Sequence, residues 1–275
     1  MLEDDPGMLD APVDPTMVFP WRTESLRMLE WAAGESEHWE WSYFFALNLW
    51  GRDRLDEARQ NVAALGDEAD YGPFYVARAR MAAGTGVVDP EVDLRRAIEL
   101  DRSDRNLRFP LVTFLHDAGR WEDAIAVSTE ALADFPGDFD MELIHATALV
   151  ETQRYEAAID VLDRVRVLPS EHSSQAHTLF AQAHTMAGLG ALEAGEAARA
   201  AEHFETATSW PERLGQGRPY EPEERLQRYA LAHAARLRGD AGGERAALEA
   251  VIGATPALAS GAAAASPYDA LAFRA

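Results

Sequence analysis

The feature that most constrains the fold is a phrase of six residues that recurs after 34 residues. Residues 120–125 read RWEDAI, and residues 154–159 read RYEAAI. Pro136 and Pro169 follow the two copies. A fixed period of this length is the signature of an array in which each unit is a helix–turn–helix pair. The sequence therefore predicts an all-α chain built from stacked helix pairs.

Related phrases and amphipathic stretches extend the array in both directions. A similar phrase begins at Arg54, and its Ala58 lies 66 residues before Ala124. Ala200 lies 42 residues after Ala158, which indicates an insertion of 8 residues in that unit. The apolar periodicity predicts helices at 23–33, 38–50, 73–83, 91–100, 106–118, 142–152, 172–193, 196–208, 222–238 and 244–254.

Two prolines modify this pattern. Pro90 stands where the repeat places an alanine, and a proline is tolerated at a helix start because its missing N–H has no partner there. We therefore expect a shortened second helix in that unit. Pro110 predicts either a helix that begins near Phe109 or a kink at this point.

Small residues recur where neighbouring helices should cross. The eighth repeat position is small in five units, whereas Arg78 occupies it in the second unit. The twentieth position is small in four units. These residues are Ala46, Val112, Ala146, Gly188 and Ala232 at the eighth position, and Ala58, Ala124, Ala158 and Ala200 at the twentieth. Five or six such pairs are expected to form a right-handed solenoid whose concave face is lined by the first helices.

The composition divides the chain into three segments. Residues 1–22 are rich in Asp and Pro and are expected to form an arm or linker. Residues 23–256 contain the predicted α-solenoid, with a capping helix at its start. Residues 257–275 form an Ala/Gly-rich tail, in which residues 268–273 are expected to dock back as a short cap.

An acidic composition limits the possible partners. The net charge is −22, and all 25 basic residues are Arg. Such a surface repels phosphate groups, so we expect neither nucleic acid nor anionic membrane as a partner. The lack of Lys is compatible with either a salt-rich cytoplasm or a GC-rich genome. The first fifteen residues carry no apolar segment of the kind found in a signal peptide, and a cytoplasmic location is therefore expected.

These repeats resemble the tetratricopeptide repeat (TPR) family over residues 37 to about 254. The resemblance rests on the 34-residue spacing and on a Gly–x–aromatic–x–x–Ala phrase, although Gln153 replaces the glycine in the second copy. A narrower resemblance is to the C-terminal repeat region of large bacterial TPR proteins, where the repeats follow a β-rich domain of unknown function. It rests on residues 17–20, 38–41, 49–52, 73–75 and 214–220. This resemblance implies a partner domain and assigns no catalytic residue.

The residues that could perform chemistry do not form a known motif. His177 and His184 lie seven residues apart, about 10 Å along a helix, whereas metal pairs on helices are three or four residues apart. The chain has no Cys. Gly84 to Gly86 reads as a turn, and Gly188 to Gly190 as close helix packing rather than a phosphate site. We therefore predict a non-enzymatic protein with no metal and no cofactor.

The repeat phase predicts which side chains face the concave groove. These positions form a mixed polar and aromatic strip that would hold a peptide, a helix or a partner domain. They are Tyr43, Tyr75, Asn106, Thr113, His116, Asp117, Thr147, Glu151, Tyr229, His233 and Arg236. The alternative is that these are ordinary solvated positions.

Three further interpretations remain open. The aromatic and acidic side chains of residues 37–43 suggest a sugar site, with the chain as the helical half of a carbohydrate-processing or carbohydrate-binding protein. Packing of the repeat explains the same residues more simply. The loop at 215–220 either closes over a ligand or, as we favour, spans an irregular junction. The long helix at 172–193 is a candidate for self-association.

Overall fold

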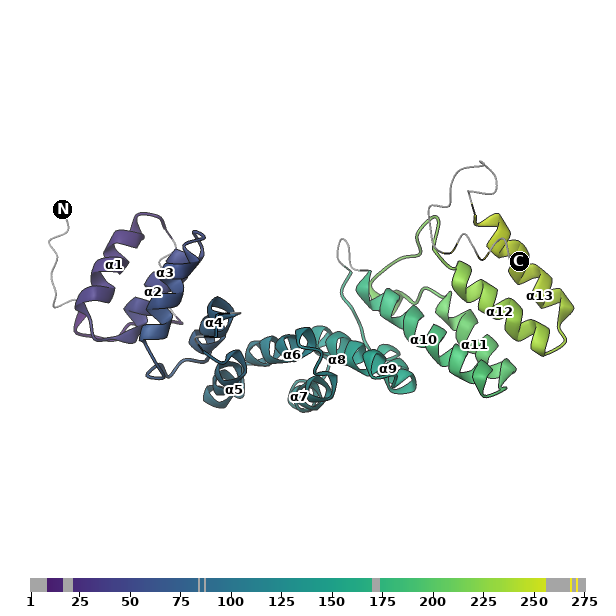
Figure 1. Cartoon of the computed structure of the whole chain (residues 1–275), viewed down its shortest axis with the longest axis horizontal. Coiled ribbons are helices and arrows are strands. Elements are labelled where there is room, and N and C mark those ends of the chain that lie inside the picture. Colours follow the sequence, from purple (N-terminus) through teal and green to yellow (C-terminus); the bar gives the residue numbers. More distant parts are fainter. Residues whose placement is uncertain are drawn as a thin grey trace. The chain divides into compact units, whose positions relative to one another are not determined.

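The computed structural model describes residues 9–16, 22–83, 85–86, 88–169, 174–255, 268 and 271. This part of the chain contains thirteen α-helices and no β-strand, which confirms the all-α prediction (Figure 1). The helices group into two compact units, Met1–Ala118 and Gly119–Ala275. The boundary follows the predicted helix at 106–118. The predicted arm and tail lie largely outside the described residues.

Unit 1 is a series of short helices in which consecutive helices contact each other. The predicted capping helix is α1, which follows Glu24 and has no side-chain cap. The aromatic stretch predicted to be buried is α2. The helices are α1 (Ser25–Glu35), α2 (Trp39–Trp50), α3 (Leu55–Ala64), α4 (Gly72–Ala82), α5 (Pro90–Leu100), the 3₁₀ turn η2 (Arg105–Leu107) and α6 (Arg108–Asp117).

The two prolines lie at helix starts, as their missing N–H groups require. Pro90 is the first residue of α5, and the Asp89 carboxylate accepts a hydrogen bond from the Glu91 N–H at 2.9 Å. Pro110 lies in the first turn of α6, which begins at Arg108. Of the two expectations for Pro110, the structure therefore shows the start near Phe109.

Aromatic rings fill the core of unit 1. Tyr43 and Phe44 on α2 pack with Phe74 and Tyr75 on α4, and all four are at least nine-tenths buried. Tyr43 meets the ring of Phe74 edge-on, at 5.6 Å and 72°, whereas Tyr43 and Phe44 are stacked at 6.0 Å. The alanine predicted at the crossing, Ala46, is fully buried. These contacts confirm that the aromatic stretch packs between neighbouring helices.

Arg78 breaks the small-residue rule, and the structure shows how unit 1 accommodates it. Its guanidinium is buried and donates to both carboxylate oxygens of buried Asp93, at 2.9 and 2.6 Å. It also donates to Asp67 at 2.8 Å and lies over the rings of Phe74 and Tyr75. A paired cation therefore occupies the position that an alanine fills elsewhere.

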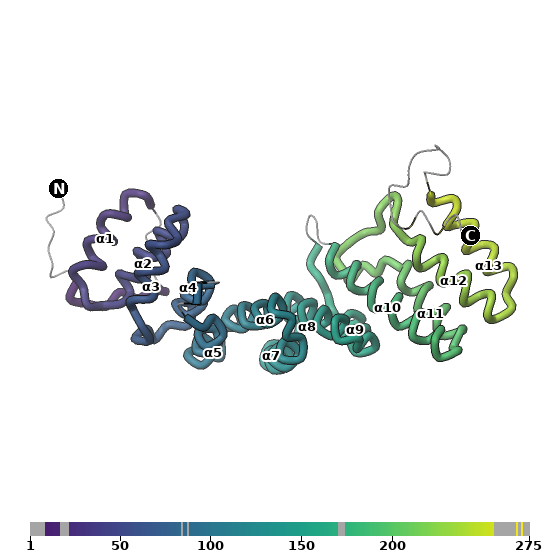
Figure 2. Tube along the Cα trace, viewed as in Figure 1, coloured from purple at the N-terminus to yellow at the C-terminus, as the bar shows by residue number. Residues whose placement is uncertain are grey.

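Unit 2 repeats the arrangement in which consecutive helices pack on each other (Figure 2). The first helices of successive pairs, α8, α10 and α12, contact one another, and each also packs on a second helix. The elements are α7 (Trp121–Asp134), α8 (Phe139–Glu151), α9 (Tyr155–Leu162), α10 (Gln175–Glu193), α11 (Ala197–Ala207), the 3₁₀ turn η3 (Glu212–Leu214), α12 (Arg225–Leu237) and α13 (Ala241–Gly253).

Small residues lie at the helix crossings of unit 2, as the repeat phase predicts. Ala146, Ala158 and Ala200 are fully buried. Gly188 on α10 faces the ring of Phe204 on α11, and a Cβ at this position would come within 2.6 Å of the ring. The glycine therefore allows α10 and α11 to approach closely, which is the packing role expected for it.

Candidate functional site

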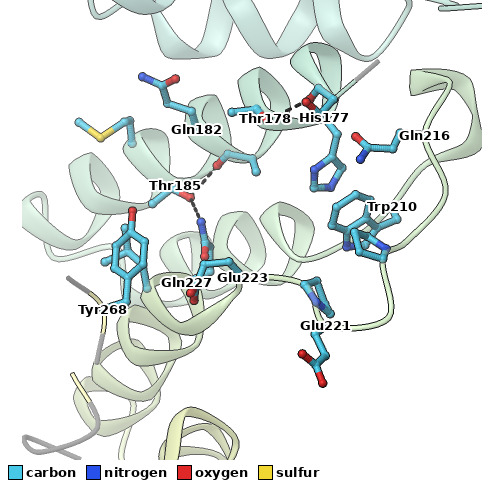
Figure 3. Close-up of a pocket in the computed structure, with 16 residues that line it drawn as sticks. His177, Thr178, Gln182, Thr185, Trp210, Gln216, Glu221, Glu223, Gln227 and Tyr268 are labelled. Atoms are coloured by element: carbon cyan, nitrogen blue, oxygen red, sulfur yellow. Dashed lines mark hydrogen bonds between the residues drawn. The ribbon is translucent and has the colours of Figure 1, made fainter. Parts of the chain in front are cut away.

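A cavity of about 490 Å³ lies in unit 2 between α10, α12 and the segment that joins α11 to α12 (Figure 3). The first helices of two successive repeats thus form its walls, and the joining segment, residues 208–224, forms one side. The lining residues are Ser174, His177, Thr178, Ala181, Gln182, Thr185, Met186, Trp210, Gln216, Pro219, Glu221, Pro222, Glu223, Leu226, Gln227 and Tyr268.

Residues 213–215 anchor the joining segment to the part of unit 2 that follows α9. Leu214 is fully buried in the core of unit 2. Gly215 adopts a φ of +72°, and a Cβ there would lie 3.0 Å from the Val167 carbonyl oxygen. The Val167 N–H donates to the Arg213 carbonyl at 2.8 Å. A side chain at residue 215 would disrupt this approach, so Gly215 positions the loop that follows.

Glu224 anchors the end of the segment, where α12 begins. Its carboxylate is buried and accepts hydrogen bonds from Trp210 Nε1 at 3.3 Å and from Arg228 at 2.5 Å. Arg218 Nη2 donates to both carboxylate oxygens at 3.1 Å. One carboxylate therefore joins α12 to two distant points of the segment. These contacts make the cavity wall an ordered structure rather than a simple spacer between repeats.

A stacked pair of rings forms one wall of the cavity. The rings of His177 and Trp210 are 3.4 Å apart between centroids and inclined by 9°. His177 Nε2 donates to the Ser209 carbonyl at 3.0 Å, which assigns the proton of a neutral imidazole to Nε2. Burial lowers the pKa of His177 below its ordinary value, so the ring is neutral at pH 7. The α10 histidine thus fixes the orientation of Trp210.

The opposite wall is polar. Gln227 Nε2 on α12 donates to Thr185 Oγ1 on α10 at 3.1 Å, and the Thr185 hydroxyl donates to the Ala181 carbonyl at 2.6 Å. On the side of the stacked rings, the side-chain oxygen of Gln216 is buried and has no hydrogen-bond partner among the described residues. In Figure 3 Gln216 lies beside the His177–Trp210 stack, across the cavity from Tyr268. This oxygen has essentially no accessible surface, so it is an unpaired acceptor enclosed within the cavity wall.

Two of the residues predicted to face the groove are core residues instead. Tyr43 is 5% exposed and Tyr75 is fully buried. The Tyr75 hydroxyl donates to the Asp67 and Ala69 carbonyls, at 3.1 and 2.9 Å. The prediction of groove contacts for these two tyrosines was wrong, because α2 and α4 bury their aromatic faces against each other.

The other predicted groove residues lie at or near the surface of one unit or the other. In unit 1 they are Asn106, Thr113, His116 and Asp117, on η2 and α6; in unit 2 they are Thr147 and Glu151 on α8, and Tyr229, His233 and Arg236 on α12. Thr113 and Thr147 use their hydroxyls to bond carbonyls of their own helices. None of these residues lines the cavity. Their binding role stays a prediction.

The cavity residues of α10 were missed because the 8-residue insertion interrupts the repeat phase from which groove positions were projected. A signal was nevertheless present in the sequence. The unit with the insertion is followed by Trp210 and by the loop at 215–220, so the extra helix length and the extra loop occur together. The loop, which we favoured as a plain junction, supplies Gln216 and Pro219 to the cavity lining.

The sugar-site interpretation gains no support from unit 1. Trp39 is half-buried, and its ring packs against Tyr43, Tyr71 and Phe74 at 5.8 to 6.4 Å.

Among the described residues, no group of three or more potential ligands is arranged to hold a metal. In the same part of the chain, no helix is long and apolar enough to cross a membrane.

Comparisons with known proteins agree with this architecture. A model of the tetratricopeptide repeat family matches residues 115–183. We found no match to the chain among the curated proteins. Among solved structures, the C-terminal part of a TPR repeat-containing protein from Cytophaga hutchinsonii superimposes with a TM-score of 0.59, at 11% identity, over 85% of this chain and 90% of that chain.

Two other solved structures superimpose less well. The MamA protein has a TM-score of 0.49 at 18% identity, over 71% of this chain and 98% of its own. YrrB, described as a TPR protein with an unusual peptide-binding site, has a TM-score of 0.45 at 16% identity, over 70% and 91%. The family model finds tetratricopeptide repeats at residues 115–183, and the superposition on the Cytophaga protein shows that the chain shares its fold.

Proposed function

We propose that this chain is a non-enzymatic interaction module whose unit 2 binds a segment of a partner protein along α8, α10 and α12. The observation that carries the proposal is the ordered cavity between α10 and α12, which lies on the row of first helices. In repeat arrays this row forms the extended concave surface used for binding. A side chain of the bound segment enters the cavity and anchors the rest.

The lining suits recognition better than catalysis. Its polar groups are mainly amides and hydroxyls, and Thr185 and Gln227 already bond each other. His177 is neutral, stacked on Trp210 and bonded to Ser209, so it is poorly placed to exchange a proton with a substrate. Such a set orients a ligand through hydrogen bonds and ring contacts.

The experiment is a selection from a displayed library of random 12-residue peptides on the immobilised full chain. Selected peptides should bind with a Kd that rises at least tenfold in Ala181→Leu, because the larger side chain fills the cavity. Ala198→Leu is the matched control, since Ala198 is exposed on α11 and does not line the cavity. Selection of no peptide, or equal binding to both variants, would contradict the proposal.

The same selection tests the predicted groove positions of unit 2. If the bound segment continues along α12, replacing Tyr229 and Arg236 by Ala should weaken the selected peptides. Unchanged affinity would confine binding to the cavity. The β-rich domain implied by the narrower family resemblance is a partner of the required kind, and co-purification of the two domains would test it. A cytoplasmic location also stays a prediction.

A further inference from the structure

One residue that lines the cavity comes from a distant part of the chain. All the other lining residues lie between Ser174 and Gln227, whereas Tyr268 follows the last helix, α13. Tyr268 is half-buried. Figure 3 draws its ring on the side of the cavity where Thr185 and Gln227 are bonded to each other. The segment after α13 therefore contributes to a cavity that α10, α12 and the joining segment build.

The end of α13 lies close to the cavity, so the segment that follows has a short distance to cover. Thr255 follows α13, and its hydroxyl accepts a hydrogen bond from Arg225 Nη1 at 3.4 Å. Arg225 is the first residue of α12 and precedes the lining residue Leu226. Tyr268 comes 13 residues after Thr255, a stretch that spans up to about 45 Å when extended. The whole of α12 is only about 20 Å long.

A short turn holds Tyr268 at the cavity. The Leu271 N–H donates to the Tyr268 carbonyl at 3.0 Å, and Leu271 is itself half-buried. A tyrosine side chain combines an apolar ring with one hydroxyl. The lining has the same mixed character, because it includes Met186 and Leu226 as well as the polar wall described above. The described residues of the tail thus have the burial and the local turn of a docked segment.

The two aromatic residues of the lining differ in how they are attached. Trp210 stacks on His177 and donates to Glu224, so two other parts of unit 2 fix its position. Tyr268 lies beyond the last helix pair, and its withdrawal would separate no two packed helices. Tyr268 is therefore the part of the lining that a ligand can displace.

We propose that the chain's own C-terminal segment docks in the cavity through Tyr268 and competes with the partner segment. The proposal rests on the peptide-binding function above and adds its regulation. Because the segment belongs to the same chain, it competes at an effective concentration on the order of millimolar. A partner must displace Tyr268, and its apparent affinity is reduced in proportion to the fraction of molecules whose cavity is already occupied.

The first test compares two tyrosine variants of the full chain. Tyr268→Ala should bind the selected peptides at least about threefold more tightly than the wild-type chain, because the competing side chain is removed. Tyr220→Ala is the matched control and should leave the affinity unchanged, since Tyr220 is 98% exposed and does not line the cavity. Unchanged or weaker binding by Tyr268→Ala, or an equal gain in both variants, would overturn the proposal.

A synthetic peptide of residues 264–275 tests the docking without a partner. The peptide carries a fluorescent label and is titrated into the full-length Tyr268→Ala chain. Its Kd should lie below about 1 mM, because docking within the chain is populated only if the Kd is below the effective concentration. The wild-type chain should bind it at least about threefold more weakly, since its own segment occupies the cavity.

A peptide with alanine in place of the tyrosine is the control for this titration and should not bind. No saturation at millimolar peptide, equal binding to the wild-type and variant chains, or equal binding of the two peptides would each overturn the proposal.

The failures of the two proposals are distinguishable. If selected peptides lose binding in Ala181→Leu but bind Tyr268→Ala no better than the wild-type chain, the peptide-binding function stands and the competition is wrong. If the selection yields no peptide on either the wild-type or the Tyr268→Ala chain, while the peptide of residues 264–275 still binds the variant, the docking stands and the partner-binding function is wrong.

Discussion

Units 1 and 2 fill the same crossing position of the repeat with different side chains. In unit 1 a large charged residue, Arg78, takes a crossing position, and Asp93 neutralises it inside the aromatic core. In unit 2 the crossing positions are small, and α10, which carries Gly188 at its crossing, buries two histidines, His177 and His184. The large charged residue at the crossing of unit 1 is thus accommodated because Asp93 on the next helix, α5, supplies a partner charge.

The largest expected effect comes from breaking the ion pair of unit 1. Arg78→Met leaves the buried Asp93 carboxylate without its partner and should lower the free energy of unfolding by about 3–5 kcal/mol. Urea unfolding followed by circular dichroism measures this loss. The double variant Arg78→Met/Asp93→Leu removes both charges and should recover most of it. A single variant as stable as the double would show that the pair contributes nothing.

The lowered pKa of His184 in unit 2 predicts that the stability of the chain depends on pH. His184 faces His203, with their Nδ1 atoms 3.1 Å apart, while Glu156 lies 3.6 Å from His203 Nε2. Burial, and then the neighbouring His203, lowers the pKa of His184 from 6.5 to about 4. The unfolded chain therefore binds a proton below pH 6.5 that the folded chain does not bind until about pH 4.

Stability should accordingly fall as the pH is lowered from 6.5 to 4, by up to about 3 kcal/mol from this group. Urea midpoints measured at half-unit pH steps test the expectation. His184→Leu should flatten the dependence, with a residual slope from His145 and His177, whose pKa values burial also lowers. An identical slope in the wild-type chain and in His184→Leu would refute the assignment.

Two glycines on α10 test whether a small residue is required only at a helix crossing. Gly188→Ala should destabilise the chain by about 1–3 kcal/mol, because its Cβ would collide with the Phe204 ring. Gly190→Ala should stabilise it by about 0.5–1 kcal/mol, since nothing lies within 4 Å of the added carbon and alanine favours helix. Thermal melting resolves the opposite signs. A stabilising Gly188→Ala would mean that Phe204 moves aside freely.

The smallest effect concerns the same turn in both units. Asp53 in unit 1 and Gln153 in unit 2 each adopt a φ of +60°, whereas the homologous turn between α6 and α7 has Gly119 at +67°. Replacing Gln153 by Gly should stabilise the turn by up to about 1 kcal/mol. Asp53→Gly should gain less, because Asp tolerates this conformation better than Gln. Equal gains in thermal melting would argue against this explanation.

The small residues at the helix crossings could be predicted from the sequence, whereas the buried ion pair of unit 1 could not. Ala146, Ala158 and Gly188 follow from the repeat phase, because each crossing imposes the same steric demand on the same position. The pairing of Arg78 with Asp93 did not follow, since the two residues belong to different helices and no repeat predicts a compensating charge. Tyr43 was placed in the groove by phase alone, although the aromatic character of α2 already favoured the core.

The candidate site was harder to predict than the fold for a similar reason. Its residues belong to the part of unit 2 where the period fails, so no position there inherits a role from a neighbouring repeat. Trp210 and Glu224 come together because the joining segment turns back toward α10, which depends on Gly215 and on contacts with Val167. Such contacts exist in the folded structure, but they produce no periodic pattern in the sequence.

The bridge between Arg213 and the region after α9 has a consequence for the order of folding. Arg213 donates to the Leu162 carbonyl at 3.2 Å and to Asp163 at 2.6 Å, across about 50 residues of chain. Helix pairs form through contacts closer in sequence, whereas this bridge must close a longer loop. We therefore expect the helices of unit 2 to form before the cavity does, so that binding competence is acquired last.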